Sequence, residues 1–241
     1  MNTSEKAPVY KRVLLKISGE ALAGDSGNGY DFNIVTSVCE AIKECTELGV
    51  EVAVVAGGGN FWRGVKDGEG KIERTRADYM GMIATVLNCL ALADRLEQMG
   101  VHSRIQTALS ISAVAEPYNK LKADSHLKKG RVVIFGCGTG HPYFSTDTAA
   151  VLRAAEIGAD IILSAKNIDG VYTADPKKDK DAKKIDVISY DEMLDRKLMA
   201  MDLTATSLAM ENNIPVLLFG LNDPENIVRA VTGERVGTRV G

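Results

Sequence analysis

Three consecutive glycines that directly follow a short apolar segment constrain this chain more than any other feature. Residues 50–56 are apolar except for Glu51, and residues 57–64 read GGGNFWRG. Glycines at the carboxyl end of a strand let the main chain approach a ligand and leave N–H groups free for an anion such as phosphate. Arg63 adds a cation. The alternative is a tight turn with a surface arginine, and the remainder of the chain decides between the two.

The charge balance argues against one class of protein. With 29 basic and 32 acidic residues, the 241-residue chain has a net charge of −3, whereas a protein that binds duplex nucleic acid usually concentrates a basic excess. An anionic ligand must therefore be held by local geometry. The four cysteines and three histidines lack metal-ligand spacing, so we expect no metal site built from protein side chains and four reduced, mostly buried thiols.

The first twelve residues are mostly polar, and no apolar run follows their charges. We therefore expect a flexible tail over residues 1–12 and no signal peptide. No segment reaches about 18 consecutive apolar residues, which argues against a membrane span. The sequence predicts a cytoplasmic protein that has neither nucleic acid nor a membrane among its partners.

Short apolar runs alternate with segments whose apolar residues recur at helical spacing. This alternation predicts a three-layer α/β/α sandwich with a mainly parallel central sheet. The length favours one domain over residues 1–241, divided into two lobes near Gly158, with residues 233–241 as a last edge strand. The expected strands are residues 13–17, 50–56, 101–106, 131–135, 160–163 and 214–219, and the expected helices are residues 34–48, 75–99, 147–157, 191–201 and 204–212.

Loops rich in glycine, hydroxyl and lysine side chains follow four of these strands, at residues 16–19, 57–63, 138–146 and 165–175. In an open parallel sheet, ligands bind beyond the carboxyl ends of the strands. The chain has neither a GxxxxGK[ST] loop nor a GxGxxG turn after a strand, so a nucleotide and a second anionic substrate would be held in another way. Lys16, Arg63, backbone N–H groups and a magnesium ion would suffice for phosphoryl transfer.

Two titratable residues of these loops have more than one interpretation. Asp147 stands at the start of a predicted helix and either caps that helix or pairs with a cation. His141 lies in a ligand loop, where contact with a ligand is favoured over general-base catalysis. The chain shows no Ser/His/Asp or Cys/His arrangement that would indicate a competing chemistry.

Six blocks in this order resemble a known family. They are KISGEAL (16–22), VVAGGGNFWRG (54–64), ADYMGMIATVLN (77–88), GTGHPYFSTDTAA (138–150), NIDGVYTADP (167–176) and MDLTA (201–205). Together they are similar to the bacterial uridylate kinases, a branch of the amino acid kinase superfamily, and the similarity extends from about residue 13 to residue 238. Any one block is a weak indicator, whereas six in order are specific.

The resemblance implies transfer of a phosphoryl group from ATP to UMP, which gives ADP and UDP in pyrimidine nucleotide biosynthesis. It implies Mg²⁺ bound mainly through the ATP phosphates, a homohexamer built as a trimer of dimers, and GTP and UTP as effectors of an allosteric enzyme. The UMP side would lie before about residue 158 and the ATP side after it. The segment that corresponds to the GTP-response loop is Gly24, Asp25, Ser26, Gly27, Asn28 and Gly29, which departs from the versions most strongly linked to GTP and leaves regulation open.

Site residues are carried over from the resemblance position by position. Lys16, Arg63 and Asp202 would be catalytic, with Asp202 orienting the phosphate-binding lysine. The implied ATP-binding residues are Lys16, Ile17, Ser18, Gly19, Gly59, Arg63, Asn167, Tyr172 and Asp175, and the implied UMP-binding residues are Gly58, Asp78, Thr139, Gly140, His141, Pro142, Tyr143, Phe144, Ser145 and Thr146. Lys166 stands where many relatives have threonine beside adenine, so either Lys166 or Asn167 would make that contact.

Two other functions compete with this interpretation. Aspartate, glutamate and acetylglutamate kinases of the same superfamily share the glycine loops but phosphorylate a carboxylate. A non-catalytic nucleotide-binding or storage protein on the same fold is the second alternative. The presence together of Lys16, Arg63, Asp78 and Asp202 argues against a mere binder, because binding alone does not require cations that bridge a transferred phosphoryl group.

Overall fold

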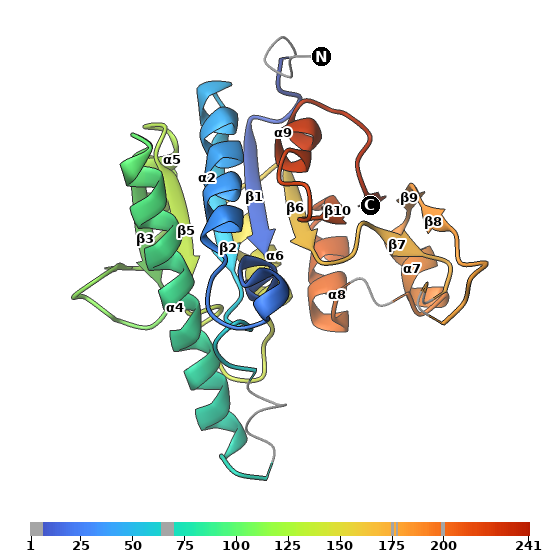
Figure 1. Ribbon diagram of the computed structural model, residues 1–241, viewed down its shortest axis with the longest axis horizontal. Helices are drawn as coiled ribbons and strands as arrows, with labels where there is room; N and C mark the ends of the chain where they lie inside the picture. Colours follow the sequence, from blue (N-terminus) through green and yellow to red (C-terminus); the bar gives the residue numbers. More distant parts are fainter. Residues whose placement is uncertain (1–6, 64–69, 175, 177, 199–200) are drawn as a thin grey trace.

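The computed structural model describes residues 7–63, 70–174, 176, 178–198 and 201–241. Within these residues a nine-stranded sheet has the order β4-β3-β5-β2-β1-β6-β10-β11-β9, and all of its pairings are parallel except β10–β11 (Figure 1). The strands are β1 (Arg12–Ile17), β2 (Glu51–Ala56), β3 (Ser103–Thr107), β4 (Glu116–Pro117), β5 (Val132–Gly136), β6 (Ile161–Lys166), β9 (Val187–Ile188), β10 (Val216–Gly220) and β11 (Thr238–Val240). A separate hairpin pairs β7 (Val171–Tyr172) with β8 (Lys184–Ile185).

Helices cover both faces of the sheet (Figure 1). The buried side chains of α2, α4 and α9 share one core with one face, whereas those of α5, α6 and α8 share a second core with the other face. This arrangement confirms the predicted three-layer sandwich. The helices are α1 (Gly19–Leu22), the 3₁₀ helix η2 (Gly24–Ser26), α2 (Phe32–Glu47), α4 (Arg74–Gln98), α5 (Lys120–Leu127), α6 (Thr146–Ile157), α7 (Tyr190–Asp195), α8 (Leu203–Glu211) and α9 (Asn226–Val231).

The central strand β1 shows why the two cores are separate. Side chains alternate between the faces of a strand. Val13, Leu15 and Ile17 accordingly lie in the core under α2, α4 and α9, and Leu14 lies in the core under α6. The next residue that faces α6 is Lys16. A lysine in a buried strand is thereby directed toward a helix rather than into solvent.

Several boundaries differ from the prediction. Residues 233–241 do not form the edge of the sheet, because β11 lies between β10 and the two-residue strand β9. Part of the expected N-terminal tail is fixed: the Val9 N–H donates to the Val231 carbonyl oxygen at 2.9 Å, and the Lys11 N–H donates to the Asp160 carboxylate at 2.7 Å. Residues 1–6 of that tail lie outside the described residues. The helix expected over residues 191–201 ends at Asp195.

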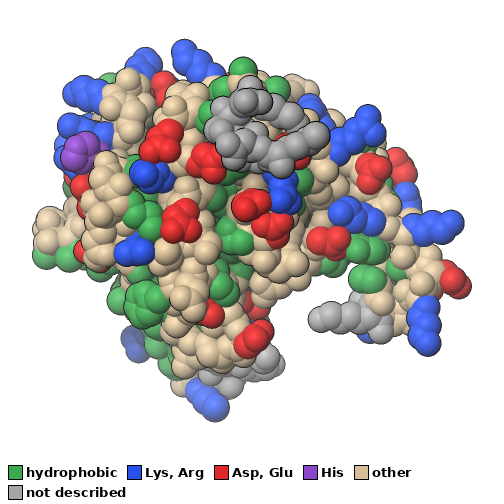
Figure 2. Space-filling view, turned by 45° about the horizontal axis from the view of Figure 1, so that its top comes forward, with side chains coloured by type: hydrophobic (Ala, Val, Ile, Leu, Met, Phe, Trp, Pro, Cys, Tyr) green, Lys and Arg blue, Asp and Glu red, His purple; other side chains and the backbone are tan. Residues whose placement is uncertain are grey.

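Charge is mixed on the surface. Over the face seen in Figure 2, Lys and Arg side chains are interspersed with Asp and Glu side chains. Salt bridges between neighbouring residues, such as Lys43–Glu47 on α2 and Arg196–Glu192 on α7, are part of this pattern. All four cysteines are free and buried, as expected, and burial raises the pKa of Cys39 and of Cys45 to about 12. These thiols therefore remain protonated at neutral pH.

Candidate active site

The carboxyl ends of the central strands bring the predicted loops together. Strand β1 lies in parallel register between β2 and β6, with Lys16 opposite Val55 on one side and Ser164 on the other. Helix α6 packs across β1, β2 and β6, on the face toward which Lys16 is directed. Lys16 is only 8% exposed. A buried ammonium requires a partner inside the protein.

That partner is Asp147, in the first turn of α6. The Nζ atom of Lys16 lies 2.7 Å from Asp147 Oδ1, and the Nζ atom of Lys166 lies 3.2 Å from Asp147 Oδ2. Burial raises the pKa of the Asp147 carboxyl, but the two ammonium groups more than offset this effect, and the pKa lies below its ordinary value. Burial lowers the pKa of Lys166 despite the attraction of Asp147. One carboxylate thus holds two cations at the end of the central strands.

The start of α6 decides between the two interpretations of Asp147. The N-cap is Ser145, whose hydroxyl accepts a hydrogen bond from the Thr148 N–H at 3.0 Å. The helix begins at Thr146, one residue before the predicted start. Asp147 is therefore the partner of a cation and not the cap.

Asp202 has contacts that differ from those that the resemblance implies. It caps α8, where its carboxylate accepts from the Ala205 N–H at 3.0 Å, and it also accepts from the hydroxyls of Ser145 and Thr148. The carboxylate in contact with Lys16 belongs instead to Asp147. Asp202 thus links the start of α8 to the start of α6. Burial lowers the pKa of the neighbouring Lys166, and the charges of Asp147 and, to a smaller extent, Asp202 only partly offset this effect.

The glycine loop, residues 57–63, packs closely on its surroundings. The Gly57 N–H donates to the Ile17 carbonyl oxygen at 2.9 Å, which extends the pairing of β1 with β2. A Cβ atom at Gly58 would lie 2.8 Å from the Gly81 carbonyl oxygen of α4. Only glycine permits this approach without displacing the backbone, so the loop is a packed element and not a free surface turn.

Arg63 is the last described residue of the glycine loop. Its Nη2 atom lies 3.0 Å from Glu20 Oε1 on α1, and its Nε donates to the Gly59 carbonyl oxygen at 3.2 Å. The side chains of Arg63 and Glu20 are 36% and 41% exposed, so solvent weakens this ion pair. The arginine is anchored at the loop yet remains accessible to an anion.

A cavity of about 250 Å³ lies between the glycine loop, the first half of α4 and the loop before α6. Its lining combines apolar side chains, hydroxyls and one carboxylate, a composition suited to a small polar ligand. The lining residues are Gly58, Gly59, Trp62, Ala77, Asp78, Gly81, Met82, Thr85, Gly138, Thr139, His141, Phe144, Ser145 and Thr146.

Asp78 is held in place at the rim of this cavity. Its Oδ2 accepts from the Tyr143 N–H at 2.8 Å and from Arg74 Nε at 2.8 Å. The guanidinium of Arg74 lies over the Tyr143 ring, 5.0 Å from its centroid, and Tyr143 has a left-handed backbone with φ of 70°. These contacts join the loop before α6 to the first turn of α4.

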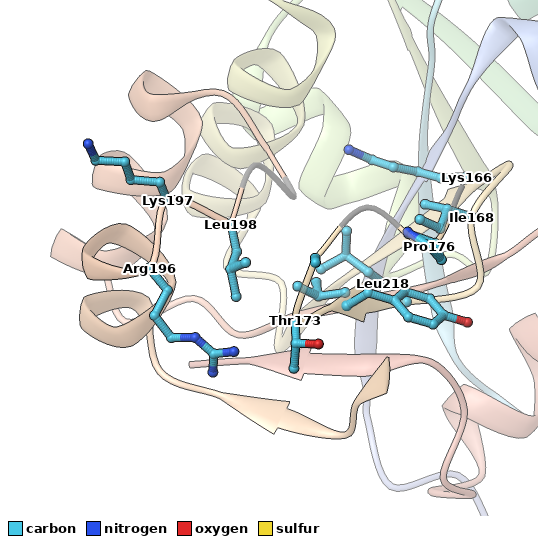
Figure 3. A pocket seen from close by; sticks show the side chains of 12 residues that line it. Lys166, Ile168, Thr173, Pro176, Arg196, Lys197, Leu198 and Leu218 are labelled. Atoms are coloured by element: carbon cyan, nitrogen blue, oxygen red, sulfur yellow. The ribbon is translucent and has the colours of Figure 1, made fainter. Parts of the chain in front are cut away.

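A larger cavity of about 620 Å³ lies beyond β6, between the β7 hairpin and the segment after α7 (Figure 3). Ile168, Val171, Leu198 and Leu218 give it an apolar lining. Leu198 and Thr173 face the space between the two segments, whereas the ammonium of Lys197 is directed away from it (Figure 3). The remaining lining residues are Lys166, Gly170, Tyr172, Ala174, Pro176 and Arg196.

Many of the predicted site residues, but not all of them, line one of the two cavities. Seven of the ten predicted UMP residues line the smaller cavity, and Gly140, Pro142 and Tyr143 do not. Lys166 and Tyr172 line the larger cavity, whereas Asn167 does not, and Asp175 lies outside the described residues. The lining residues that were not predicted as site residues are the apolar ones of the larger cavity and, in the smaller cavity, Trp62, Ala77, Gly81, Met82, Thr85 and Gly138.

The predicted GTP-response loop, residues 24–29, contacts the glycine loop directly. Gly27 and Gly29 have φ of 67° and 71°, which favour glycine. The Gly29 N–H donates to the Asn60 carbonyl oxygen at 3.1 Å. The structure thus places this loop beside the phosphate-suited loops rather than at a distance from them.

Comparison with known proteins agrees with this geometry. Residues 11–220 match the model of the amino acid kinase family. UMP kinase from Bacillus anthracis is 40% identical with a TM-score of 0.93, and the alignment covers 96% of each chain. UMP kinase from Ureaplasma parvum is 36% identical with a TM-score of 0.90, over 96% of this chain and 98% of that one. Uridylate kinase from Archaeoglobus fulgidus is 31% identical with a TM-score of 0.74, over 95% and 99%.

The family match covers most of the chain and includes the Lys16, Arg63 and Asp147 positions. The identity and coverage shared with the two bacterial enzymes exceed what a common fold alone would give. This chain therefore belongs to the amino acid kinase family, in the branch that contains the UMP kinases.

Proposed function

We propose that this protein transfers the γ-phosphoryl group of ATP to UMP and releases ADP and UDP, a step in pyrimidine nucleotide biosynthesis. The observation that carries the proposal is the position of the paired lysines between two cavities. Lys166 lines the larger cavity, Thr146 lines the smaller one, and Asp147, the neighbour of Thr146, contacts Lys166 and Lys16. A ligand in each cavity would direct its phosphates toward this cluster.

Each cavity fits one nucleotide. The larger cavity is apolar, with room for a purine, and ends at Lys166, which suits adenine with its phosphates directed to the lysines. The smaller cavity offers the Asp78 carboxylate for ribose hydroxyls and the hydroxyls of Thr139 and Thr146 for a neutral pyrimidine. We assign ATP to the former and UMP to the latter.

The proposed reaction is an in-line displacement. A phosphate oxygen of UMP attacks the γ-phosphorus of ATP, a new P–O bond forms, and the bond to the β-phosphate oxygen breaks as ADP leaves. The protein supplies charge and position rather than a covalent group. Lys16 and Lys166 would neutralise the transferred phosphoryl group, and Arg63, at the accessible end of the glycine loop, would contact it from the opposite side.

Magnesium fits such a site as a companion of ATP. Among the residues that the structure describes, no group of three acidic, histidine or cysteine side chains could hold a metal ion alone. Mg²⁺ is usually bound through substrate phosphates and one or two carboxylates. Asp147 is engaged with two lysines, whereas the hydrogen bonds that Asp202 accepts within the described residues come from hydroxyl and amide donors, so Asp202 is the better carboxylate for the ion. When bound, Mg²⁺ would neutralise charge on the phosphates.

Further partners of the protein would be other copies of the same chain and the effectors GTP and UTP. The exposed apolar side chains of α4 support self-association, which the resemblance specifies as a homohexamer. The contact of residues 24–29 with Asn60 supports an effector response to GTP or UTP, because a ligand on that loop would act on the glycine loop. The similarity to UMP kinases supports a soluble, cytoplasmic enzyme.

A coupled assay of ADP release tests the proposed function. UMP, CMP, dUMP, GMP, glutamate and aspartate are offered with ATP and Mg²⁺, each with and without GTP. We expect turnover with UMP well above that with the other acceptors. Turnover of glutamate or aspartate without turnover of UMP would show that the protein is a carboxylate kinase.

Substitution of the cations separates catalysis from binding. Lys16→Ala and Arg63→Ala are expected to lower kcat by roughly 10²-fold or more, while calorimetric binding of UMP changes little, because these groups stabilise charge that develops in the transition state. Lys43→Ala, at a partly exposed lysine that pairs with Glu47 on α2, is the matched control. Unchanged turnover in both site variants would indicate a non-catalytic nucleotide-binding protein.

A further inference from the structure

Two buried asparagines lie next to the proposed phosphate site without lining either cavity. Asn60 belongs to the glycine loop, and Asn88 lies in the middle of α4. The two residues are 2% and 0% exposed. Buried amides are costly unless every donor finds an acceptor, so their partners reveal what they hold together.

The two amides form a closed pair. Asn60 Nδ2 donates to Asn88 Oδ1 at 3.0 Å, and Asn88 Nδ2 donates to Asn60 Oδ1 at 2.8 Å. The second hydrogen of each amide goes to a backbone carbonyl oxygen, from Asn60 to Gly29 at 2.9 Å and from Asn88 to Gly57 at 2.6 Å. All four N–H donors are thus used. Turning either amide over would place its oxygen against a carbonyl oxygen.

Three segments converge on this pair. Gly57 is the first residue of the glycine loop, and Gly29 ends the loop over residues 24–29. The third segment is the start of α1, where a Cβ atom at Gly19 would lie 2.7 Å from Asn60 Oδ1 and 2.4 Å from the Gly57 carbonyl oxygen. The backbone that follows Lys16 therefore rests directly on the amide pair.

We propose that Asn60 and Asn88 are positioning residues that hold the glycine loop and the loop after β1 in the geometry required for phosphoryl transfer, and that fix residues 24–29 to both. This inference rests on the proposed function. The pair touches neither cavity, so it acts through Gly57, Gly29 and Gly19. Through its bond to Gly29, a change in residues 24–29 would reach the phosphate loops.

The chemistry of the pair requires two amides. An aspartate in place of Asn88 has the same shape but cannot donate to the Gly57 carbonyl oxygen or to Asn60 Oδ1, and its charge faces both oxygens. A protonated aspartate regains one donor. Burial next to these oxygens raises the pKa of such a carboxyl, so the protonated form would be populated at accessible pH.

The first test compares Asn88→Asp and Asn60→Asp with the wild type in the ADP-release assay. A misplacement of about 1 Å in a catalytic loop costs up to roughly 10²-fold in rate. We therefore expect kcat to fall by about 10- to 100-fold while KM for UMP changes by less, and the ratio of variant to wild-type kcat to rise as the pH is lowered. Asn88→Ser, which is neutral and smaller, replaces Asn88→Asp if the latter does not fold.

The matched control is Leu96→Ala, a buried position two turns further along α4. It lowers thermal stability without touching either loop, so its kcat is expected to remain near that of the wild type. An equal loss of kcat in Leu96→Ala and in the asparagine variants would show that the effect is one of stability and would overturn the proposal. Full kcat in folded Asn88→Asp or Asn88→Ser would overturn it as well.

A second readout does not depend on turnover. Trp62, the single tryptophan of the chain, lies in the glycine loop and donates from Nε1 to the Ala77 carbonyl oxygen at 2.8 Å. Its emission and the hydrogen exchange of residues 24–29 and 57–63 are expected to change in the Asn88 variants but not in Leu96→Ala. If the wild type does not phosphorylate UMP, the proposed function fails. Unchanged emission and exchange would overturn the positioning role.

Discussion

At the scale of single residues, the site is organised by one carboxylate between two lysines. Asp147 neutralises part of a charge cluster that Lys16 and Lys166 would otherwise bring together at the end of the central strands. A polyphosphate is a stronger source of negative charge than one carboxylate. Bound ATP would therefore compete with Asp147 for the same ammonium groups.

Replacing Asp147 by asparagine tests this arrangement. Removal of one partner from a buried ion pair typically costs about 3 kcal/mol, which corresponds to roughly 6–12 °C in Tm for a domain of this size. We expect Asp147→Asn to show this loss in differential scanning calorimetry. ATP is expected to raise Tm more in the variant than in the wild type, because its phosphates replace the missing charge.

Asp124→Asn is the matched control, because Asp124 also lies between two cations, Arg12 and Lys128, but away from the site. ATP-induced Tm shifts of equal size in the wild type and in Asp147→Asn would contradict the prediction.

The pKa of Asp147 is lowered from its ordinary 3.8 in the folded protein. Its contribution to stability is therefore complete above 3.8 and is lost as the pH falls from 3.8 through the lower folded value, so the two proteins should converge in stability only below that folded pKa.

Lys166 gives a second prediction, on the alkaline side. Burial lowers its pKa from the ordinary 10.5, so the free enzyme loses this cation at a lower pH than an exposed lysine would. We expect kcat/KM for ATP, which reports the free enzyme, to fall with this ionisation. Lys166→Arg should move that limb to higher pH. An unchanged profile in Lys166→Arg would show that another group titrates.

This alkaline loss is separable from unfolding. Lys166 has a lower pKa in the folded protein than in the unfolded chain, so the folded protein releases this proton at a lower pH. Between the two pKa values, the contribution of Lys166 to the free energy of unfolding therefore rises with pH. Circular dichroism over the same pH range is therefore expected to show a folded protein while kcat/KM declines. Lys43→Arg, at a partly exposed lysine away from the site, serves as the control that should leave the profile unchanged.

At the scale of elements, the glycine loop depends on its packing against α4. A Cβ atom at Gly58 would lie 2.8 Å from the Gly81 carbonyl oxygen and 2.9 Å from the Ala84 Cβ. Gly58→Ala is expected to lower the free energy of unfolding by about 1–3 kcal/mol, the usual cost of overpacking, and to raise KM for UMP. Urea denaturation and initial-rate kinetics measure the two effects.

Gly81→Ala provides the comparison for stability. A Cβ atom there would meet only Trp62 Cδ1, at an ordinary 3.7 Å, and alanine is favoured over glycine within a helix by up to about 1 kcal/mol. The free energy of unfolding should therefore stay the same or increase. If Gly58→Ala were as stable as Gly81→Ala, close packing would not explain the glycine at position 58.

Strands and helices whose apolar residues form a clear run or a regular repeat could be predicted from the sequence. Two-residue strands and irregular segments could not. The short apolar run over residues 13–17 predicted β1, and the direction of Lys16 toward α6 explains how a lysine is accommodated in this buried strand. The strand expected over residues 160–163 was too short: β6 continues through the polar residues Ser164 and Lys166, which face α6. This error concealed the pairing of Lys166 with Asp147.

The cavities were harder to predict than the loops. A loop carries its own composition, so the glycine loop and residues 138–146 stood out. The larger cavity is formed by residues from three separate segments, two of which contribute Leu198 and Leu218. Neither leucine differs from an ordinary core residue in sequence. The two-residue strand β9 also lacks any periodicity, so its place at the edge of the sheet beside β11 followed only from tertiary pairing.

At the scale of the whole molecule, helix α4 presents a second surface. Its buried side packs in the core, but five large hydrophobic residues on the remainder are 37–54% exposed, namely Tyr79, Met80, Ile83, Leu87 and Leu90. Met80, Ile83, Leu87 and Leu90 are three to four residues apart, and Tyr79 is four residues before Ile83, so the five lie along one side of the helix. Contiguous exposed apolar surface of this kind marks an interface. By length and composition, α4 is also the one helix in the described residues that could cross a membrane.

Self-association is the prediction that this surface supports. The double variant Ile83→Glu/Leu87→Glu is expected to sediment as a smaller species than the wild type, because two charges would be buried without partners. Leu121→Glu, at a 74% exposed leucine on α5, is the control that should leave the assembly intact. A trimer of dimers requires two kinds of contact, so the variant would retain whichever contact does not involve α4.

Sedimentation velocity and vesicle flotation together show whether the α4 surface contacts another copy of the chain or a lipid membrane. A wild-type protein that sediments as an oligomer and does not float with lipid vesicles has its α4 side chains covered by another copy of the chain. A monomer that floats has them in lipid, which would contradict the proposed assembly. Because α4 also carries Asp78, Gly81, Thr85 and Asn88, loss of the interface should lower turnover of UMP at constant protein concentration as well as changing the mass.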